Sequence, residues 1–397
     1  ALTKALAQRY RKSSNKTKTK ILDEFVSTSG YNRKYAIHIL SNYGLEKIRY
    51  IDGKAVKITI GQKSKKKRVG HPRYGSEVKK AIIALWKFFD YMCGKRLVVL
   101  IRANLALLCH QPELQISNAV QTQLLQISAS TIDRMLAGER KKLTIKGRTH
   151  TKHGPLLKHQ IPIRTNYTWD ERQPGFFELD TVGHDGGSAT GEYCFTLTAT
   201  DVFSGWTEVR ALRNRAHRWV KEHVQAIVTT LPFPVKGIDS DNGGEFINHL
   251  LLNYCRDAHI EFTRGRSYRK NDNCFVEQKN DMVVRRTVGY YRFDTEEEFA
   301  ALREVYLHLC PLINYFYPSY KIIAKERIGP KVKKTYDEPK PPVQRLLEAD
   351  HVSSGIKHRL RIEMKKVHLT KQKKKVDQAI FNLLRLYEKK KQIRLFD

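Results

Sequence analysis

Three acidic residues that are far apart in the chain each stand where a regular element is expected to begin or end. Asp180 closes a short apolar run that is typical of a strand, and Asp241 follows a second such run just before an Asn-Gly turn. Glu277 lies near the start of an expected helix. Carboxylate oxygens are the ligands that hard divalent cations prefer. Two such ions about 3.5–4 Å apart activate an attacking oxygen and stabilise a leaving oxygen at a phosphodiester. The three acids therefore predict phosphoryl-transfer chemistry, provided that the fold brings them together.

Neighbouring acids compete for these roles. Glu178 and Asp180 are two residues apart on one expected strand and share a face, and we favour Asp180 because it lies at the strand end. Asp239 and Asp241 pose the same choice, and the adjacent Asn-Gly favours Asp241. Asp201 precedes a Gly-containing turn and is predicted to cap that turn.

The sequence motifs around the three acids match those of a known family. Between Asp241 and Glu277 stand 35 residues (242–276), Asp241 opens an Asp-Asn-Gly word, and Glu277 lies in the word Val-Glu-Gln-Lys-Asn. The segment 176–280 resembles the catalytic core of the retroviral integrase superfamily, in the branch of bacterial insertion-sequence transposases. Members of that family carry two Asp and one Glu with this spacing. The resemblance implies an α/β ribonuclease-H-like core, built as a mixed five-stranded sheet with helices.

The resemblance also implies an activity, that of a Mg²⁺-dependent DNA transposase. Such an enzyme binds the ends of a mobile element, cuts at the 3′ ends and joins the freed 3′-hydroxyl to target DNA. Asp180 and Asp241 would hold two Mg²⁺ ions, which Mn²⁺ can replace, and Glu277 would complete the shell of the second ion. No Tyr or Ser nucleophile is expected, because the reaction needs no covalent enzyme–DNA intermediate.

Two alternatives stay open. One is a metal-dependent nuclease of the same fold that cuts DNA but never joins it. The other is a non-enzymatic DNA-binding regulator derived from a transposase, which the presence of all three acids disfavours.

Composition points to a nucleic-acid partner. The 397 residues contain 73 Lys and Arg against 40 Asp and Glu, which gives a net charge of +33. A field of this sign attracts a polyanion, and double-stranded DNA, as element end and as target, is the expected one. The hydrophobic content of 41% is enough for buried cores, and the length favours two to four domains.

Location follows from what the chain lacks in sequence. Its apolar runs fall short of the roughly 18 residues that a membrane span needs, and no secretory signal is visible. The six cysteines form no CxxC pair, which argues against a zinc site and against a disulfide scaffold. We therefore expect a protein of the bacterial cytoplasm that acts at the nucleoid, without a membrane partner.

All-α DNA-binding domains are expected before the core. Residues 1–50 predict a helix-turn-helix after a mobile start (1–16), with Ala36, Ile37 and Leu40 facing inward; an ordinary helical hairpin is the alternative. Residues 51–75 predict a basic linker. Residues 76–145 predict a second, helix-turn-helix-like domain, in which Ile132, Met135 and Leu136 face inward and Ser128 or Ser130 caps the last helix.

A basic connector (146–168) then leads into the core (169–320). Within it we expect strands at 176–182, 193–201, 207–212, 233–239 and 260–264, and helices at 215–231 and 245–259. A basic C-terminal region (321–397) ends in a helix at 371–391, whose apolar side predicts packing in cis or in a dimer.

Candidate DNA contacts are the basic residues of these segments, together with one threonine. They are Arg33, Lys34, Lys65, Lys66, Lys67, Arg68, Thr131, Arg134, Arg140, Arg264, Arg266, Arg269, Lys270 and Lys279. The four from Arg264 to Lys270 are predicted to clamp phosphates, and Lys279 is expected to reach outward from the apolar side of its helix. Asn242, Asn271 and Asn280 are predicted to orient groups at the site. A homodimer or a higher multimer is expected on DNA.

Overall fold

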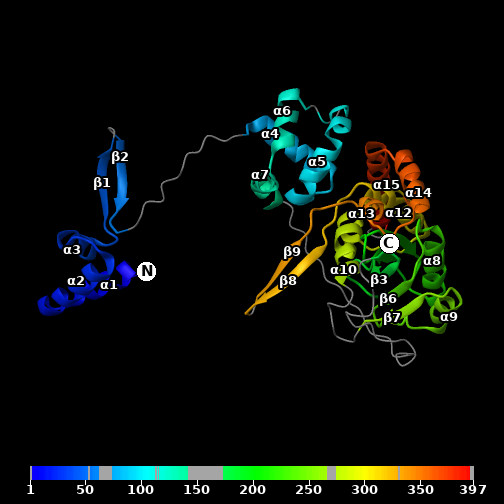
Figure 1. Ribbon diagram of the computed structural model, residues 1–397, viewed down its shortest axis with the longest axis horizontal. Coiled ribbons are helices and arrows are strands. Elements are labelled where there is room, and N and C mark those ends of the chain that lie inside the picture. The colour runs from blue at the N-terminus through cyan, green and yellow to red at the C-terminus, as the bar shows by residue number, and fades with distance from the viewer. Residues whose placement is uncertain are drawn as a thin grey trace. The chain divides into compact units, whose positions relative to one another are not determined.

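The computed structural model describes residues 2–51, 54–61, 74–111, 114, 116–141, 173–265, 274–329 and 331–393 (Figure 1). They form two compact units, residues 1–73 and residues 74–397, which are described separately. Within these ranges, no helix has the length and apolar character needed to cross a membrane.

The N-terminal unit is a three-helix cluster followed by a hairpin. Its helices are α1 (Leu2–Lys12), α2 (Asn15–Ser29) and α3 (Arg33–Asn42), and its antiparallel strands are β1 (Glu46–Ile51) and β2 (Lys54–Thr59). Helix α2 is capped at its C-terminus by Gly30, which adopts φ +67°. Helix α3 is capped by Asn32, whose side chain accepts a 2.9 Å hydrogen bond from the backbone of Lys34.

Three expectations for this unit were wrong. The start of the chain was expected to be mobile, but α1 packs its buried Ala7 against the other helices. Ile37 is 41% exposed, whereas Ile39 is 6% exposed, because the buried stripe continues from Ala36 to the positions three and four residues later. Strand β2 lies where a linker was predicted, and its pairing with β1 is a contact that no local pattern announces.

The first part of the second unit is all-helical, as predicted. It contains α4 (Ser76–Phe88), α5 (Gly94–Cys109), α6 (Asn118–Gln126) and α7 (Ala129–Lys141). Ile132 and Leu136 are fully buried, and Met135 is partly buried against them. Ser128 is the cap, since its hydroxyl accepts a 3.3 Å hydrogen bond from the backbone of Thr131.

The core sheet has five strands in the order β5-β4-β3-β6-β7. They are β3 (Phe176–Gly183), β4 (Phe195–Asp201), β5 (Thr207–Leu212), β6 (Gly237–Ser240) and β7 (Glu261–Arg264). The first three are antiparallel, and β6 and β7 add in parallel, which confirms the predicted mixed sheet. Strand β6 begins four residues later than predicted, because prolines at 232 and 234 cannot donate ladder hydrogen bonds.

Helices α8 (His217–Thr230) and α9 (His249–Asp257) accompany the sheet. Helix α10 (Cys274–Lys279), which carries Glu277, runs into a π-helical turn, η1 (Asn280–Arg285), and then α11 (Arg286–Val288). After α12 (Glu296–Tyr315), the chain forms the hairpin β8 (Ile322–Ile328) and β9 (Lys331–Tyr336), and then α13 (Pro342–Glu348), α14 (Ser354–Lys366) and α15 (Leu369–Ile393). The hairpin was not predicted.

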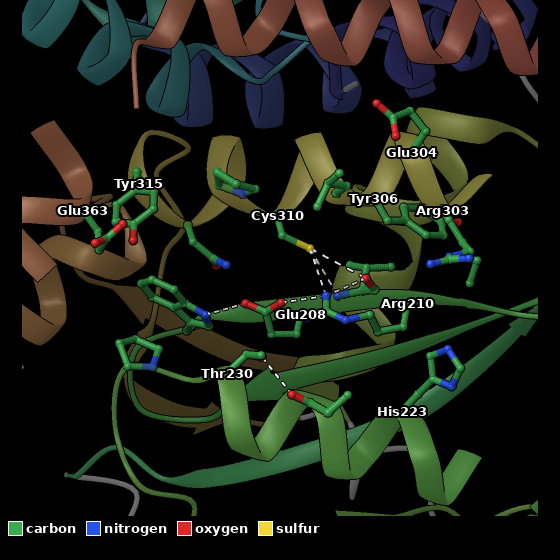
Figure 2. A pocket seen from close by; sticks show the side chains of 18 of the residues that line it. Glu208, Arg210, His223, Thr230, Arg303, Glu304, Tyr306, Cys310, Tyr315 and Glu363 are labelled. Atoms are coloured by element: carbon green, nitrogen blue, oxygen red, sulfur yellow. Dashed lines mark hydrogen bonds and ion pairs between the residues drawn. The ribbon is translucent and has the colours of Figure 1, made fainter. Parts of the chain in front are cut away.

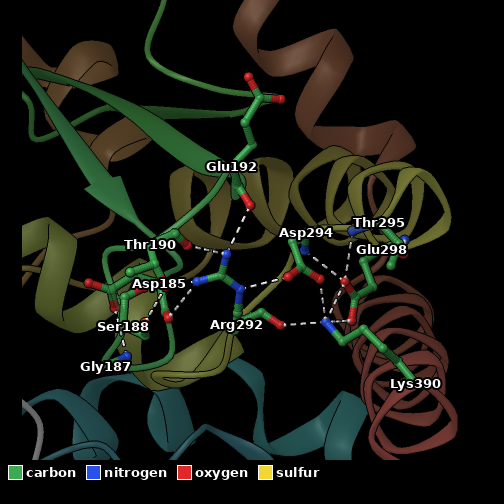
Figure 3. Close-up of polar contacts among 10 residues, drawn as sticks. All are labelled: Asp185, Gly187, Ser188, Thr190, Glu192, Arg292, Asp294, Thr295, Glu298 and Lys390. Atoms are coloured by element: carbon green, nitrogen blue, oxygen red, sulfur yellow. Dashed lines mark hydrogen bonds and ion pairs between the residues drawn. The ribbon is translucent and has the colours of Figure 1, made fainter. Parts of the chain in front are cut away.

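The last helix packs in cis, one of the two options that its apolar side allowed. Val376, Ala379 and Leu383 of α15 are buried in the same core as α12. Near its end, Lys390 Nζ lies 2.9 Å from Asp294 Oδ1 and 2.6 Å from Glu298 Oε1 (Figure 3). These two ion pairs fix the end of α15 to the start of α12.

The loop between β3 and β4 is fixed to the same place by one arginine. The guanidinium of Arg292 donates to the backbone carbonyls of Ser188 and Thr190, both at 2.8 Å, and its Nε lies 2.6 Å from Asp294 (Figure 3). A loop that leaves β3 shortly after Asp180 is therefore held in one conformation.

Side chains of α12 satisfy the outer edge of the sheet at β5. The amide of Asn314 accepts from the backbone N–H of Thr207 at 2.8 Å and donates to its carbonyl at 2.9 Å. The backbone N–H of Val209 donates to Cys310 Sγ at 3.3 Å. Both residues line a cavity of about 860 Å³ between β5, α8 and α12 (Figure 2). The helix thereby stands in for a sixth strand along this part of the edge.

Candidate active site

The register of two parallel strands brings the first two acids together. Leu179 of β3 pairs with Ser240 of β6, and this is the last pair of that ladder. Asp180 and Asp241 are the next residues along the two chains, so they lie side by side just beyond this ladder. Asp180 was expected at a strand end, but β3 continues to Gly183 and Asp180 pairs with Thr198 of β4. Asp241 is held there by a 2.9 Å hydrogen bond from the backbone N–H of Gly243 to its Oδ1.

The electrostatics of Asp180 show which charges surround it. Burial raises the pKa of Asp180 well above its ordinary value, and the Asp241 carboxylate raises it further. Glu277 and Glu245 raise this pKa in addition, while the 2.7 Å hydrogen bond from the backbone of Thr181 lowers it. The carboxyl groups of Asp241, Glu245 and Glu277, from the loop after β6 and from α10, therefore all act on Asp180 of β3. The assignment of Asp180, Asp241 and Glu277 as the catalytic acids stays a prediction.

Glu178 anchors α10, the helix that contains the third acid, Glu277. Glu178 is fully buried, and its Oε2 accepts hydrogen bonds from the backbone N–H groups of Phe275 (2.9 Å) and Val276 (3.0 Å). A carboxylate at this position caps the first turn of α10 and favours its positive end. Val276 is buried and Glu277 is exposed, and the charge of Glu277 helps to raise the pKa of Asp180.

The remaining acids nearby have structural roles. Asp239 is fully buried and accepts a 2.6 Å hydrogen bond from Thr263 Oγ1. Asp201 accepts from the backbone N–H groups of Gly175 (2.8 Å) and Ser204 (2.7 Å), which confirms that it caps a turn. These partners explain why Asp241 and Asp180, rather than their neighbours, face the site.

Two asparagines brace the acids. Nδ2 of Asn280, the first residue of the π-helical turn, donates a 2.7 Å hydrogen bond to Asp180 Oδ2. Its Oδ1 is buried and has no hydrogen-bond partner among the described residues. Asn242 donates to the carbonyl of Gly265 at 2.8 Å and accepts from Arg264 Nη1 at 3.0 Å, so it shapes the turn that follows Asp241.

Sequence reasoning missed Glu245. It is 9% exposed, and its Oε1 accepts a 3.0 Å hydrogen bond from Thr181 Oγ1, directly beside Asp180. Gly243 makes room for it, because a Cβ there would lie 2.7 Å from Glu245 Oε2 and 2.8 Å from Asp241 Oδ1. The Gly-Gly-Glu that follows Asp-Asn in the sequence was the available signal.

The donor set suits a hard divalent cation. Asp180, Asp241 and Glu277 offer carboxylate oxygens, and Asn280 adds the buried amide oxygen that has no partner in the described chain. In those same ranges, no three Asp, Glu, His or Cys side chains are grouped closely enough to form a ready-made ion site. Mutual repulsion of the carboxylates opposes such grouping, and a cation between them would relieve it.

Some predicted DNA contacts lie on the surface. Arg33 and Lys34 are exposed on α3, where Arg33 forms an ion pair with Asp23. Arg134 is exposed on α7 and donates a 3.1 Å hydrogen bond to Thr131 Oγ1, which is partly buried. Other candidates lie outside the described residues, namely Lys65, Lys66, Lys67, Arg68, Arg266, Arg269, Lys270 and Asn271.

The structure places three basic candidates differently from the prediction. Arg264 is 8% exposed and donates to Asn242, so it supports the turn after Asp241 instead of clamping phosphate. Lys279 turns inward, where its Nζ donates to the carbonyl of Gly205 at 3.0 Å and burial lowers its pKa to about 7. Arg140 pairs with Asp133 at 2.6 Å and lies over the ring of Trp86. In each case the side chain has a hydrogen-bond or ion-pair partner within the fold.

Three comparisons with known proteins each found a similar protein or domain. Residues 170–270 match the family model described as an integrase core domain, a range that includes Asp180 and Asp241. An uncharacterized protein, y4rM from Sinorhizobium fredii, is 37% identical over 344 residues, covering 87% of this chain and 93% of that protein. The catalytic core domain of BIV integrase is similar at 18% identity with a TM-score of 0.28, covering 45% of this chain and 96% of that one.

Proposed function

This chain belongs to the integrase and transposase family, with a ribonuclease-H-like integrase core domain, and from that premise we propose that it is a DNA transposase. It binds the ends of a mobile element, cuts the DNA at the 3′ ends and joins each 3′-hydroxyl to target DNA. The observation that supports this most directly is the placement of Asp180 beside Asp241 at the end of the β3–β6 ladder, where the charges of Asp241 and Glu277 both raise the pKa of Asp180.

Each residue has a defined part in the proposal. Asp180 and Asp241 would hold two Mg²⁺ ions, for which Mn²⁺ can substitute, and Glu277 would complete the coordination shell of the second ion. When bound, this pair of ions activates the attacking oxygen and stabilises the leaving oxygen. Asn280 keeps Asp180 in one orientation through its 2.7 Å hydrogen bond. Glu178 keeps α10, and with it Glu277, against β3.

The experiment that tests the proposal uses the full chain, duplexes that carry the candidate ends flanking its gene, and a supercoiled plasmid with Mg²⁺. Cleaved ends and plasmid-joined products are expected. Glu277→Gln should lose both products with little change in DNA affinity. Glu261→Gln, at an exposed position on β7, is the matched control and should retain both.

The same assay separates the alternatives. Cleaved ends that never join the plasmid would identify a nuclease of this fold. A biological effect that survives Asp180→Asn would identify a DNA-binding regulator. Light scattering of the protein with and without end DNA tests the proposed homodimer or higher multimer, and one copy per duplex would contradict it.

A further inference from the structure

The hairpin of β8 and β9 exposes apolar side chains that a two-stranded ribbon cannot bury by itself. Ile323 is 64% exposed, Ile328 56%, Val332 53% and Tyr336 46%. An isolated two-stranded hairpin is marginally stable in water, and exposed apolar side chains grouped in this way indicate a binding surface. Figure 1 shows the ribbon standing away from the core sheet.

The charge of the ribbon indicates the kind of partner. Residues 321–336 contain six Lys and Arg and a single acid, Glu326. Glu326 pairs with Lys333 across the ribbon and Arg327 pairs with Val332, so Arg327, Val332 and Lys334 share the other face. A ribbon of this width fits the major groove of B-DNA, and a cationic face with interspersed apolar groups suits its backbone and base edges.

The base of the ribbon is held rigidly. The backbone N–H of Lys321 donates to Asp337 Oδ1 at 2.7 Å, and the backbone N–H of Asp337 donates to the carbonyl of Lys321 at 3.0 Å. Arg345 of α13, 9% exposed, binds Asp337 at 2.5 Å and the carbonyl of Ser319 at 2.7 Å. These hydrogen bonds fix the base of the ribbon to α13 of the core.

The base of the ribbon also adjoins α10, the helix that carries Glu277. Ser319, Tyr320 and Lys321 line one small cavity together with Gln278 and Lys279, which follow Glu277 on α10. Tyr320 further contacts α5, through a 2.9 Å hydrogen bond between its hydroxyl and Cys93 Sγ. The ribbon thus starts where the first residues of α5, helix α10 and helix α13 lie close together.

From charge, exposure and placement we propose that the β8–β9 ribbon is a DNA-binding arm, which holds a duplex next to the Glu277 side of the site. This rests on the proposed function in one respect, that the substrate of the site is DNA.

The test compares two triple variants of the full chain on a random-sequence duplex of about 40 base pairs. The arm variant is Arg327→Gln, Lys333→Gln and Lys334→Gln. The control variant is Arg359→Gln, Arg361→Gln and Lys365→Gln, which removes the same charge from exposed positions of α14. Fluorescence anisotropy between 50 and 300 mM NaCl gives the affinity and its salt slope, and thermal melting verifies the fold.

Loss of the arm charges should weaken binding about tenfold or more at 100 mM NaCl and reduce the salt slope by about 2, roughly one each for Arg327 and Lys334, which share the cationic face. The control should change both values much less. Equal behaviour of the two variants would overturn the proposal. An altered oligomeric state with unchanged DNA affinity would overturn it as well, and would assign the ribbon to a second copy of the chain.

The outcomes also separate the arm from the proposed function. If the wild-type protein cuts and joins DNA and the arm variant binds DNA as tightly as the wild type, only the proposed role of the ribbon is wrong. If the arm variant binds DNA more weakly but the wild-type protein neither cuts nor joins DNA, the ribbon's role stands and the transposase proposal is wrong.

Discussion

The amide of Asn280 reaches across from the π-helical turn to donate a 2.7 Å hydrogen bond to Asp180, 100 residues earlier in the chain. A π-turn adds a residue to the helical ladder, and such turns are frequent at functional sites. Here it begins three residues after Glu277 and places the amide against the central strand. One short segment therefore contributes both a proposed ligand and the group that orients another.

Replacing Asn280 should slow the reaction without weakening DNA binding. Asn280→Ala removes the hydrogen bond to Asp180, and loss of a group that orients a metal ligand costs about 10–100-fold in metal affinity or activity. Single-turnover cleavage measured over a Mg²⁺ titration checks this. Activity within twofold of the wild type at every Mg²⁺ concentration would contradict the role.

Replacing Glu178 should affect stability as well as activity. Glu178→Gln keeps the shape but replaces the charged acceptor of two backbone N–H groups, which should lower the free energy of unfolding by about 1–3 kcal/mol. Cleavage should fall too, because α10 loses its anchor. Urea unfolding and the cleavage assay measure the two effects. Glu261→Gln is again the control, and equal stability of the two variants would argue against the cap.

Gly243→Ala should separate activity from stability. The new Cβ would lie within 3 Å of carboxylate oxygens of Asp241 and Glu245, and both side chains can rotate away. We therefore expect a loss of cleavage of about a hundredfold or more, with a melting temperature within a few degrees of the wild type. Gly138→Ala, where nothing lies within 4 Å of the added carbon, should leave activity unchanged. A fully active Gly243→Ala enzyme would show that the close packing of these carboxylates is unimportant.

Acid should destabilise the core through His184. Burial, with a smaller contribution from Arg285, lowers the pKa of this fully buried imidazole to about 3. Its Nε2 lies 2.7 Å from Thr196 Oγ1. Between the ordinary pKa of about 6.5 and about 3, the unfolded chain binds a proton that the folded chain does not. Stability from this group is present above pH 6.5 and is lost as the pH falls, by up to about 1.4 kcal/mol per pH unit.

Urea unfolding of wild type and His184→Phe from pH 7 to pH 4 measures this dependence. The variant should show a flatter decline in the free energy of unfolding, because the titrating group is gone. Parallel curves for the two proteins would contradict a neutral buried His184. The comparison of slopes does not depend on the packing cost of the substitution itself.

Local sequence patterns were enough to predict the elements of the core and to select the candidate acids. Apolar runs ending at Asp180 and before Asp241, the Asn-Gly turn, and a polar face around Glu277 are local patterns, and local patterns report the period and ends of strands and helices. The stripe of Val376 and Leu383 likewise indicated a packed terminal helix.

The tertiary structure alone decided which charged side chains face the site and which support it. Glu178 and Asp180 share a strand face, yet only the packing of α10 over β3 makes Glu178 a helix cap. Lys279 turns inward because the carbonyl of Gly205, 74 residues earlier in the chain, accepts a hydrogen bond from its Nζ. The β8–β9 pairing and the bond between Asn280 and Asp180 are likewise set by partners distant in sequence, and a residue's local pattern carries no record of such partners.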